Sequence, residues 1–135
     1  MGTDGITDLS KLLGEMRPAL DPDAFVYCCV SFGDPAAALA SLAQGVFREE
    51  EGLTLILERH VADEAGLAYG SVMRMITLNV HSALEAVGLT AAVSTALTQA
   101  NISANVVAAY YHDHIFVPQA DAERALQVLQ QLTKA

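Results

Sequence analysis

The sequence predicts an α+β fold of two ferredoxin-like (βαββαβ) units, with antiparallel sheets and helices on one face. The main observation is the order of the expected elements. After a first helix, the pattern strand-helix-strand-strand-helix occurs twice along 135 residues. That pattern is most of a ferredoxin-like unit, which needs one further strand. The composition also indicates a folded chain, because 53% of the residues are hydrophobic and 17% are charged.

The first block begins after a helix that opens at Thr7-Asp8 and stops before Pro18. Residues 24–30 read as a strand that is apolar on both faces. Asp34-Pro35 suits a helix start, with Asp as the N-cap and Pro at the first helical position. The helical spacing of the following apolar residues predicts a buried stripe, made of Leu39, Leu42, Ala43 and Val46.

A hairpin closes the first block. Residues 46–58 contain two apolar runs separated by Glu50-Glu51-Gly52, and glycine supplies the positive φ that such turns need. A short helix follows, over residues 61–65 at most.

The second block repeats this order. Residues 73–80 predict a strand, and a small-residue helix follows through Leu89, Val93 and Leu97. Residues 105–111 and 114–117 form two strand runs with a turn at Tyr111-His112-Asp113. Pro118 starts the last helix, whose inner face is lined by Ala122, Ala125, Leu126, Leu129 and Leu132.

The two blocks predict a domain division at residues 1–70 and 71–135. The first block can take its final strand from residues 73–80. The second block has no strand after its last helix, so it must borrow one from the first block or from another subunit, or leave an open edge.

Charge and length exclude several classes of partner. A net charge of −9 leaves too few cations to neutralise a nucleic-acid backbone or to bind an anionic membrane surface. No apolar run approaches the roughly 20 residues that span a bilayer, and the first residues do not resemble a secretory signal. Cys28 and Cys29 read as small core residues of a cytoplasmic protein.

The second block resembles a known family. Gly88-Leu89-Thr90-Ala91-Ala92-Val93, the step Asn101-Ile102-Ser103-Ala104 and the strand pair that follows are similar to an ACT domain. They resemble the regulatory ACT repeats of aspartokinases. The ending, residues 110–118, is similar to small stand-alone bacterial tandem-ACT proteins and to the ACT repeats of cytosolic arginine sensors. The first half resembles the divergent first unit of the bacterial family. This resemblance implies paired ACT units, a homodimer and amino-acid binding where units pair.

In ACT-like units the ligand lies against the loop between the first strand and the first helix, which here is residues 79–89. Free backbone N–H groups at a helix start can hold a carboxylate, and Gly88 lets a ligand approach closely. The loop offers hydrogen-bonding side chains and a helix start, and the predicted ligand residues there are Asn79, Ser82, Glu85, Val87, Gly88 and Leu89. The alternative is a solvated loop in which Gly88 serves only helix packing.

Asp113 is a second candidate ligand residue. By position it resembles the acidic residue that the arginine-sensor repeat places before its own His and apolar strand, and it could contact a cationic side chain or an amino group. Asn105, at the start of the preceding strand, completes the predicted ligand set. The alternative is that Asp113 caps the hairpin turn.

His112 and His114 invite a metal interpretation, because residues two apart lie on one side of a strand. Asp113 would point the other way, and no further ligand has supporting spacing, so we predict no metal and no cofactor. No catalytic grouping stands out, and we predict no enzyme. The leading hypothesis is a small regulatory protein that binds a free amino acid. The alternatives are a ligand-free interaction module and, remotely, a metal-dependent enzyme.

Overall fold

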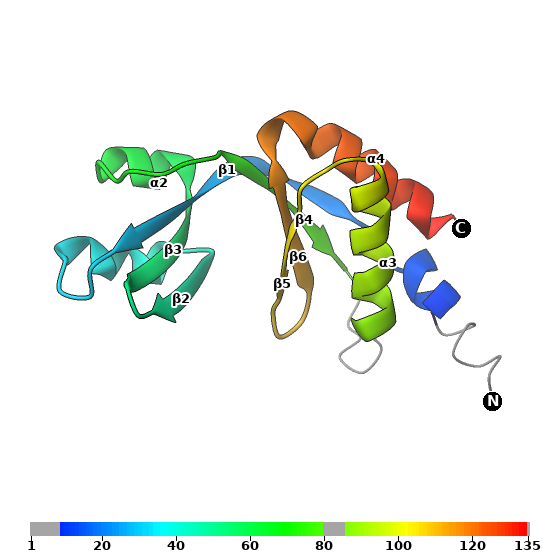
Figure 1. Ribbon diagram of the computed structural model, residues 1–135, viewed down its shortest axis with the longest axis horizontal. Coiled ribbons are helices and arrows are strands. Elements are labelled where there is room, and N and C mark those ends of the chain that lie inside the picture. Colours follow the sequence, from blue (N-terminus) through cyan, green and yellow to red (C-terminus); the bar gives the residue numbers. More distant parts are fainter. Residues whose placement is uncertain (1–8, 80–85, 135) are drawn as a thin grey trace. The chain divides into compact units, whose positions relative to one another are not determined.

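The computed structural model describes residues 9–79 and 86–134 (Figure 1). In chain order the elements after the first helix are β1 (Ala19–Val30), η1 (Pro35–Leu42), β2 (Gly45–Glu49), β3 (Gly52–Glu58), α2 (Arg59–Glu64), β4 (Met73–Leu78), α3 (Ala86–Gln99), β5 (Asn105–Ala108), β6 (Asp113–Pro118), η2 (Gln119–Asp121) and α4 (Ala122–Thr133). This order confirms the predicted α+β fold with its repeated strand-helix-strand-strand-helix pattern. The chain forms two compact units, a small unit (Pro22–Met73) and a large unit (Met1–Asp21 with Arg74–Ala135).

The small unit is an antiparallel sheet in the order β2-β3-β1. Its core lies on one face of the sheet. There the alternate side chains of β1 and β3 pack with α2 and η1, and the buried members are Val26, Cys28, Val30, Leu53, Leu55, Leu57 and Ala62. Burial raises the pKa of the Cys28 thiol. The prediction that both cysteines are core residues is wrong for Cys29, which is exposed because it points to the opposite face.

The hairpin between β2 and β3 turns where the sequence predicts. Gly52 has a φ of 152°, and a Cβ atom there would lie 2.6 Å from the backbone oxygen of Val30. Glycine is therefore required by both the backbone angle and the close approach of β1.

The helix after Asp34 begins as predicted but is a 3₁₀ helix. Asp34 is the N-cap, and its Oδ1 accepts a hydrogen bond of 2.8 Å from the backbone N–H of Ala36. The predicted buried stripe is wrong, because no residue of η1 is buried and Leu42 is 64% exposed. A 3₁₀ helix has about three residues per turn, so residues with α-helical spacing do not share one face.

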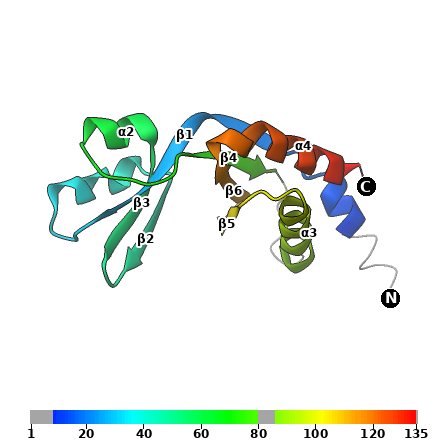
Figure 2. The same cartoon turned by 45° about the horizontal axis from the view of Figure 1, so that its top comes forward.

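In the large unit, β4, β6 and β5 are neighbours in that order, and β5 and β6 pair antiparallel. Helices α3 and α4 cover one face of these strands (Figure 2). The buried core between them is made of Ile76, Leu78, Leu89, Val93, Leu97, Ile102, Ile115, Val117, Ala122, Ala125 and Leu129, with Leu13 and Met16 from the first helix region.

The start of the chain belongs to the large unit. A helix over residues 9–14 precedes β1, and the backbone oxygen of Met16 accepts a hydrogen bond of 2.8 Å from the N–H of Asn79. The first residues of β1, up to Asp21, lie beside β4 in the strand order, and the Arg74 guanidinium donates to the backbone oxygen of Asp21. The strand missing from the second block therefore comes from β1 of the same chain.

Several element ends differ from their predictions. The strand expected over residues 105–111 stops at Ala108, and Tyr110 and Tyr111 lie in the turn. The last helix begins after Pro118, with one 3₁₀ turn before α4. Thr7, Asp8 and Val80 lie outside the described residues. No helix in the described part of the chain is long and apolar enough to cross a membrane.

Candidate functional site

The first turn of α3 is the centre of the predicted site. The first four N–H groups of an α-helix have no partner within the helix, so they can bind an external acceptor. Gly88 is the third residue of α3 and is half-buried. A Cβ atom on Gly88 would lie 3.4 Å from Cδ1 of Leu9, so this glycine faces the N-terminal helix. The Leu89 side chain is 1% exposed and belongs to the core, which leaves only its backbone for ligand contact.

The structure does not describe the side chains of three predicted ligand residues. Ser82 and Glu85 lie outside the described residues, and of Val87 only the backbone in α3 is described. Asn79, at the end of β4, is described and is already engaged. Its Nδ2 donates a hydrogen bond of 2.8 Å to the backbone oxygen of Arg17. Together with its backbone N–H, Asn79 fastens the segment before β1, a role that the sequence did not indicate.

Asn105 and Asp113 lie on the β5–β6 hairpin but not on the same face. Asn105 is opposite Phe116, and Asp113 is opposite Ala108. The offset between these pairs is three residues, and an odd offset places side chains on opposite faces of a sheet. The structure therefore does not bring these two candidates together. The turn between them is closed by a backbone hydrogen bond of 2.9 Å from the N–H of Ala109 to the oxygen of His112.

A small polar cluster lies on the face of β4 and β6 that points away from α3 and α4. The Nδ1 atom of His114 is 2.9 Å from Oγ1 of Thr77, and its ring centroid is 6.3 Å from that of His112. Burial, and secondly the charge of a protonated His112, lower the pKa of His114, and Asp113 opposes this shift. Nδ1 of His112 is buried without a hydrogen-bond partner among the described residues. Within those residues no three His, Cys, Asp or Glu side chains gather as a metal site would require.

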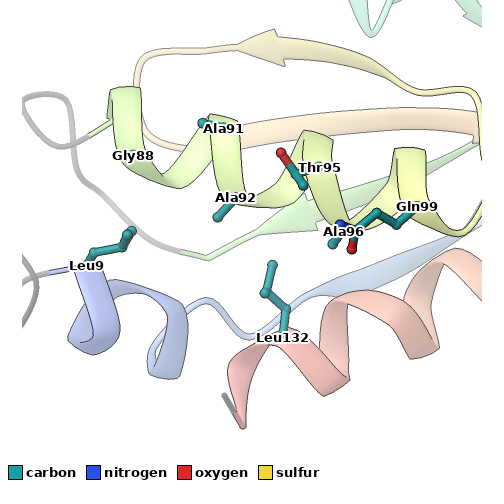
Figure 3. A pocket seen from close by; sticks show the side chains of 8 residues that line it. All are labelled: Leu9, Gly88, Ala91, Ala92, Thr95, Ala96, Gln99 and Leu132. Carbon is teal, nitrogen blue, oxygen red and sulfur yellow. The ribbon is translucent and has the colours of Figure 1, made fainter.

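An open groove of about 480 Å³ starts beside Gly88 and follows α3 (Figure 3). Its lining comes from three helices: Leu9 of the N-terminal helix, Leu132 of α4, and Gly88, Ala91, Ala92, Thr95, Ala96 and Gln99 of α3. None of these residues is charged, and α3 itself carries no charged residue over its 14 positions. The groove can therefore accept an uncharged, mainly apolar group. The small residues of α3 were visible in the sequence, but the two helices that complete the groove were not.

In the corresponding loop of the small unit, a side chain of the same loop already accepts a hydrogen bond from the helix start. This loop connects β1 to η1 through residues 31–34, and the Asp34 carboxylate occupies the N–H of Ala36. A ligand carboxylate would have to displace the Asp34 carboxylate from this N–H, and the two negative charges would repel each other. The start of η1 is therefore a poor candidate for binding a ligand carboxylate.

Comparison with known proteins identifies the family. Two family profiles described as ACT domains match in tandem, over residues 4–74 and 71–131. The chain belongs to the ACT domain family. This confirms the resemblance seen in the sequence. The matched ranges meet near the predicted division at residues 70 and 71, whereas the compact units assign the residues before Pro22 to the large unit.

Solved structures agree on the fold. A protein of unknown function from Vibrio cholerae, described as a possible transport protein, is 46% identical; the match covers 96% of this chain and 98% of that one, with a TM-score of 0.83. A protein from Agrobacterium tumefaciens is 16% identical over 88% of this chain and 90% of that one, with a TM-score of 0.70. The regulatory subunit of aspartate kinase from Thermus thermophilus, in its ligand-free form, is 14% identical. That match covers 87% of this chain and 97% of the other, with a TM-score of 0.66. No curated protein gives a significant match.

Proposed function

We propose that this tandem ACT protein is a cytoplasmic, non-catalytic regulator that binds a free amino acid at the first turn of α3. The observation that carries the proposal is the groove that starts beside Gly88, next to the first N–H groups of α3, which have no partner within the helix. In ACT domains this strand-to-helix connection is where an amino acid binds. In the small unit, the Asp34 carboxylate already caps the corresponding helix start.

The lining of the groove favours a neutral amino acid. If the carboxylate binds at the start of α3, the side chain extends along Leu9 and Ala92, where no charged group is present to pair with a charged ligand. Burying an unpaired charge there is costly, while an apolar side chain gains roughly 25 cal/mol for each Å² removed from water. Asp113, Glu85 and Ser82 remain proposed partners for the amino group.

Regulation needs a second state or a partner. We propose that the protein acts as a homodimer and that the amino acid binds one arrangement of the dimer more tightly than another, because a ligand shifts an equilibrium only by such a difference. The alternative is an ACT-type interaction module without a ligand. Two observations favour it: Gly88 packs against Leu9, and the Asn79 side chain is held by the Arg17 backbone.

A thermal-shift screen against the twenty amino acids tests the proposal. A ligand that binds only the folded protein adds about 2.7 kcal/mol at 100 times its Kd, which raises the melting temperature of a domain this size by several degrees. We expect a neutral apolar amino acid to give the largest shift. If all twenty are silent at millimolar concentration, the interaction module becomes the better account.

Two glycine variants locate the site. Gly88→Ala replaces glycine within a helix, so we expect the unliganded protein to gain roughly 0.5–1 kcal/mol, and the new methyl group narrows the start of the groove and reduces the ligand-induced shift. Gly14→Ala is the matched control, because Gly14 also lies in a helix and a Cβ atom there meets nothing within 4 Å. Equal ligand responses in the two variants would place the ligand away from Gly88.

A further inference from the structure

The turn of the β5–β6 hairpin exposes two aromatic side chains that touch each other. Tyr110 is 86% exposed and Tyr111 is 65% exposed. Their ring centroids are 4.8 Å apart and their planes meet at 71°, so the rings form an edge-to-face pair. A backbone hydrogen bond from the N–H of Ala109 to the oxygen of His112 closes this turn. The tyrosine turn (residues 109–112) is therefore one continuous aromatic surface at the tip of the hairpin (Figure 1).

The other large apolar side chains that are exposed do not form such a surface. Val46 and Phe47 are both exposed on β2, but neighbouring residues of a strand point to opposite faces of the sheet. The ring of Phe32 already has a cation of its own unit over it, because the Arg48 guanidinium lies 4.9 Å from its centroid. The tyrosine turn is thus the best candidate for contact with another molecule.

The charge around the tyrosine turn favours a cationic partner. Over residues 105–118 the sequence has one acidic residue, Asp113, and no Lys or Arg. The whole chain has 16 acidic and 7 basic residues, which gives a net charge of −9. In the large unit, the guanidinium groups of Arg74 and Arg124 donate to the backbone oxygens of Asp21 and Ala100, away from the turn. The chain therefore attracts a basic segment and repels an acidic one.

Arginine fits this surface better than lysine. The face of a tyrosine ring attracts a cation, and a planar guanidinium group also stacks on the ring, which an ammonium group does not. The chain itself contains a contact of this kind, in which Arg48 lies over Phe32. Tyrosine and arginine are also enriched among the residues that dominate protein–protein binding. Tyrosine loses little conformational entropy when it is held in a contact.

We propose that the tyrosine turn binds an arginine-bearing segment of a partner protein. Guanidinium groups of that segment lie over the rings of Tyr110 and Tyr111, and the negative charge of the chain increases the rate of their encounter. The inference rests on the regulatory role in the proposed function, because it supplies the contact with a regulated protein. It does not depend on a bound amino acid, since no residue of the hairpin lines the groove along α3.

The test is the fluorescence anisotropy of labelled peptides that are titrated with the full-length protein. The probe is a flexible peptide in which each arginine is followed by glycine and serine. The matched peptide has lysine at each arginine position, so it carries the same charge without the planar group. We expect the native protein to bind the arginine peptide several-fold more tightly than the lysine peptide.

Three variants locate the contact. Tyr110→Ser with Tyr111→Ser should weaken binding of the arginine peptide about tenfold, because both ring faces are lost. Tyr110→Phe with Tyr111→Phe keeps both rings and should bind as the native protein does. Phe47→Ser removes an aromatic ring of the small unit that is 70% exposed, and it should also leave binding unchanged. Circular dichroism melts confirm that all variants are folded.

Each other outcome overturns the inference. Equal binding of the two peptides would show only attraction between opposite charges, and equal binding by the double serine variant would place the contact elsewhere. Loss of binding in the double phenylalanine variant would assign it to the hydroxyl groups. No binding of the arginine peptide at millimolar protein would remove the arginine-bearing partner. A lower mass of the double serine variant in light scattering would show that a second copy covers the turn.

Failure of this inference is distinguishable from failure of the proposed function. Amino-acid binding is measured by thermal shift without any peptide, and the tyrosine variants leave the residues around Gly88 unchanged. A protein that responds to an amino acid but does not bind the arginine peptide keeps its proposed ligand and loses only this surface.

Discussion

At the scale of single residues, the histidine on β6 shows how burial produces a dependence on pH. His114 is half-buried, contacts Thr77, and lies near a second imidazole. Its charged form loses hydration and meets a like charge when His112 is protonated, so the folded protein favours the neutral ring. The pKa of His114 in the folded chain is therefore below its ordinary value of 6.5.

We predict that stability falls as the pH drops through 6.5 toward the lowered pKa of His114. In that range the unfolded chain binds more protons than the folded chain, so the free energy of unfolding increases with pH and this contribution is complete above 6.5. Melting temperatures between pH 5 and pH 8 measure the slope, and His114→Gln should reduce it. Thr77→Val is the control, since it removes the hydrogen bond but keeps the imidazole. An unchanged slope in His114→Gln would contradict the assignment.

At the scale of elements, the features that depend on neighbouring residues in the chain could be predicted. The hairpin at Gly52, the cap at Asp34 and the apolar stripe of α3 each follow from local chemistry, and all three are present. The η1 stripe failed because a sequence pattern does not distinguish a 3₁₀ helix from an α-helix. The strand before Tyr110 was predicted too long because aromatic residues favour strands, and here the turn exposes them.

The β2–β3 hairpin gives a prediction at this scale. Gly52→Ala should lower the free energy of unfolding by roughly 1–3 kcal/mol, because alanine is strained at positive φ and its methyl group would meet the Val30 backbone. Urea denaturation measures the change. Gly33→Ala, in the loop before η1 of the same unit, is the control, since a Cβ atom there meets nothing within 4 Å. Its effect should stay within about 0.5 kcal/mol. Equal effects of the two substitutions would show that the close approach at Gly52 does not matter.

At the scale of the whole molecule, the sequence predicted two units but not how the chain is divided between them. A strand pattern reports that residues are extended and which face is apolar, but it does not name the neighbouring strand. The sharing of β1 between the units therefore became visible only in three dimensions. The same limit applies to the candidate site. Residues 79–89 were identified by resemblance, whereas the contact of Gly88 with Leu9 and the hydrogen bond of Asn79 to Arg17, 62 residues earlier, depend on the start of the chain.

This sharing predicts that residues 71–135 will not fold stably alone. The fragment lacks Leu13 and Met16, which are 9% and 0% exposed in the core of the large unit, and the β1 residues that lie beside β4. It also lacks Arg17, whose backbone holds Asn79. Burying a Leu or Met side chain contributes roughly 1.5–3 kcal/mol, so losing both removes a large part of the stability of a small domain. We expect a broad, weakly cooperative thermal transition by circular dichroism.

A peptide of residues 9–21 added to this fragment should restore a cooperative transition, because it supplies the missing apolar contacts and the strand edge together. The same peptide with Leu13→Ala and Met16→Ala should fail, since it keeps the backbone partners but leaves cavities in the core. Rescue by both peptides would show that strand pairing and backbone hydrogen bonds, rather than the buried side chains, hold the start of the chain in the large unit. A fragment that melts cooperatively by itself would contradict the assignment of these residues to the large unit and would favour a unit that begins at residue 71.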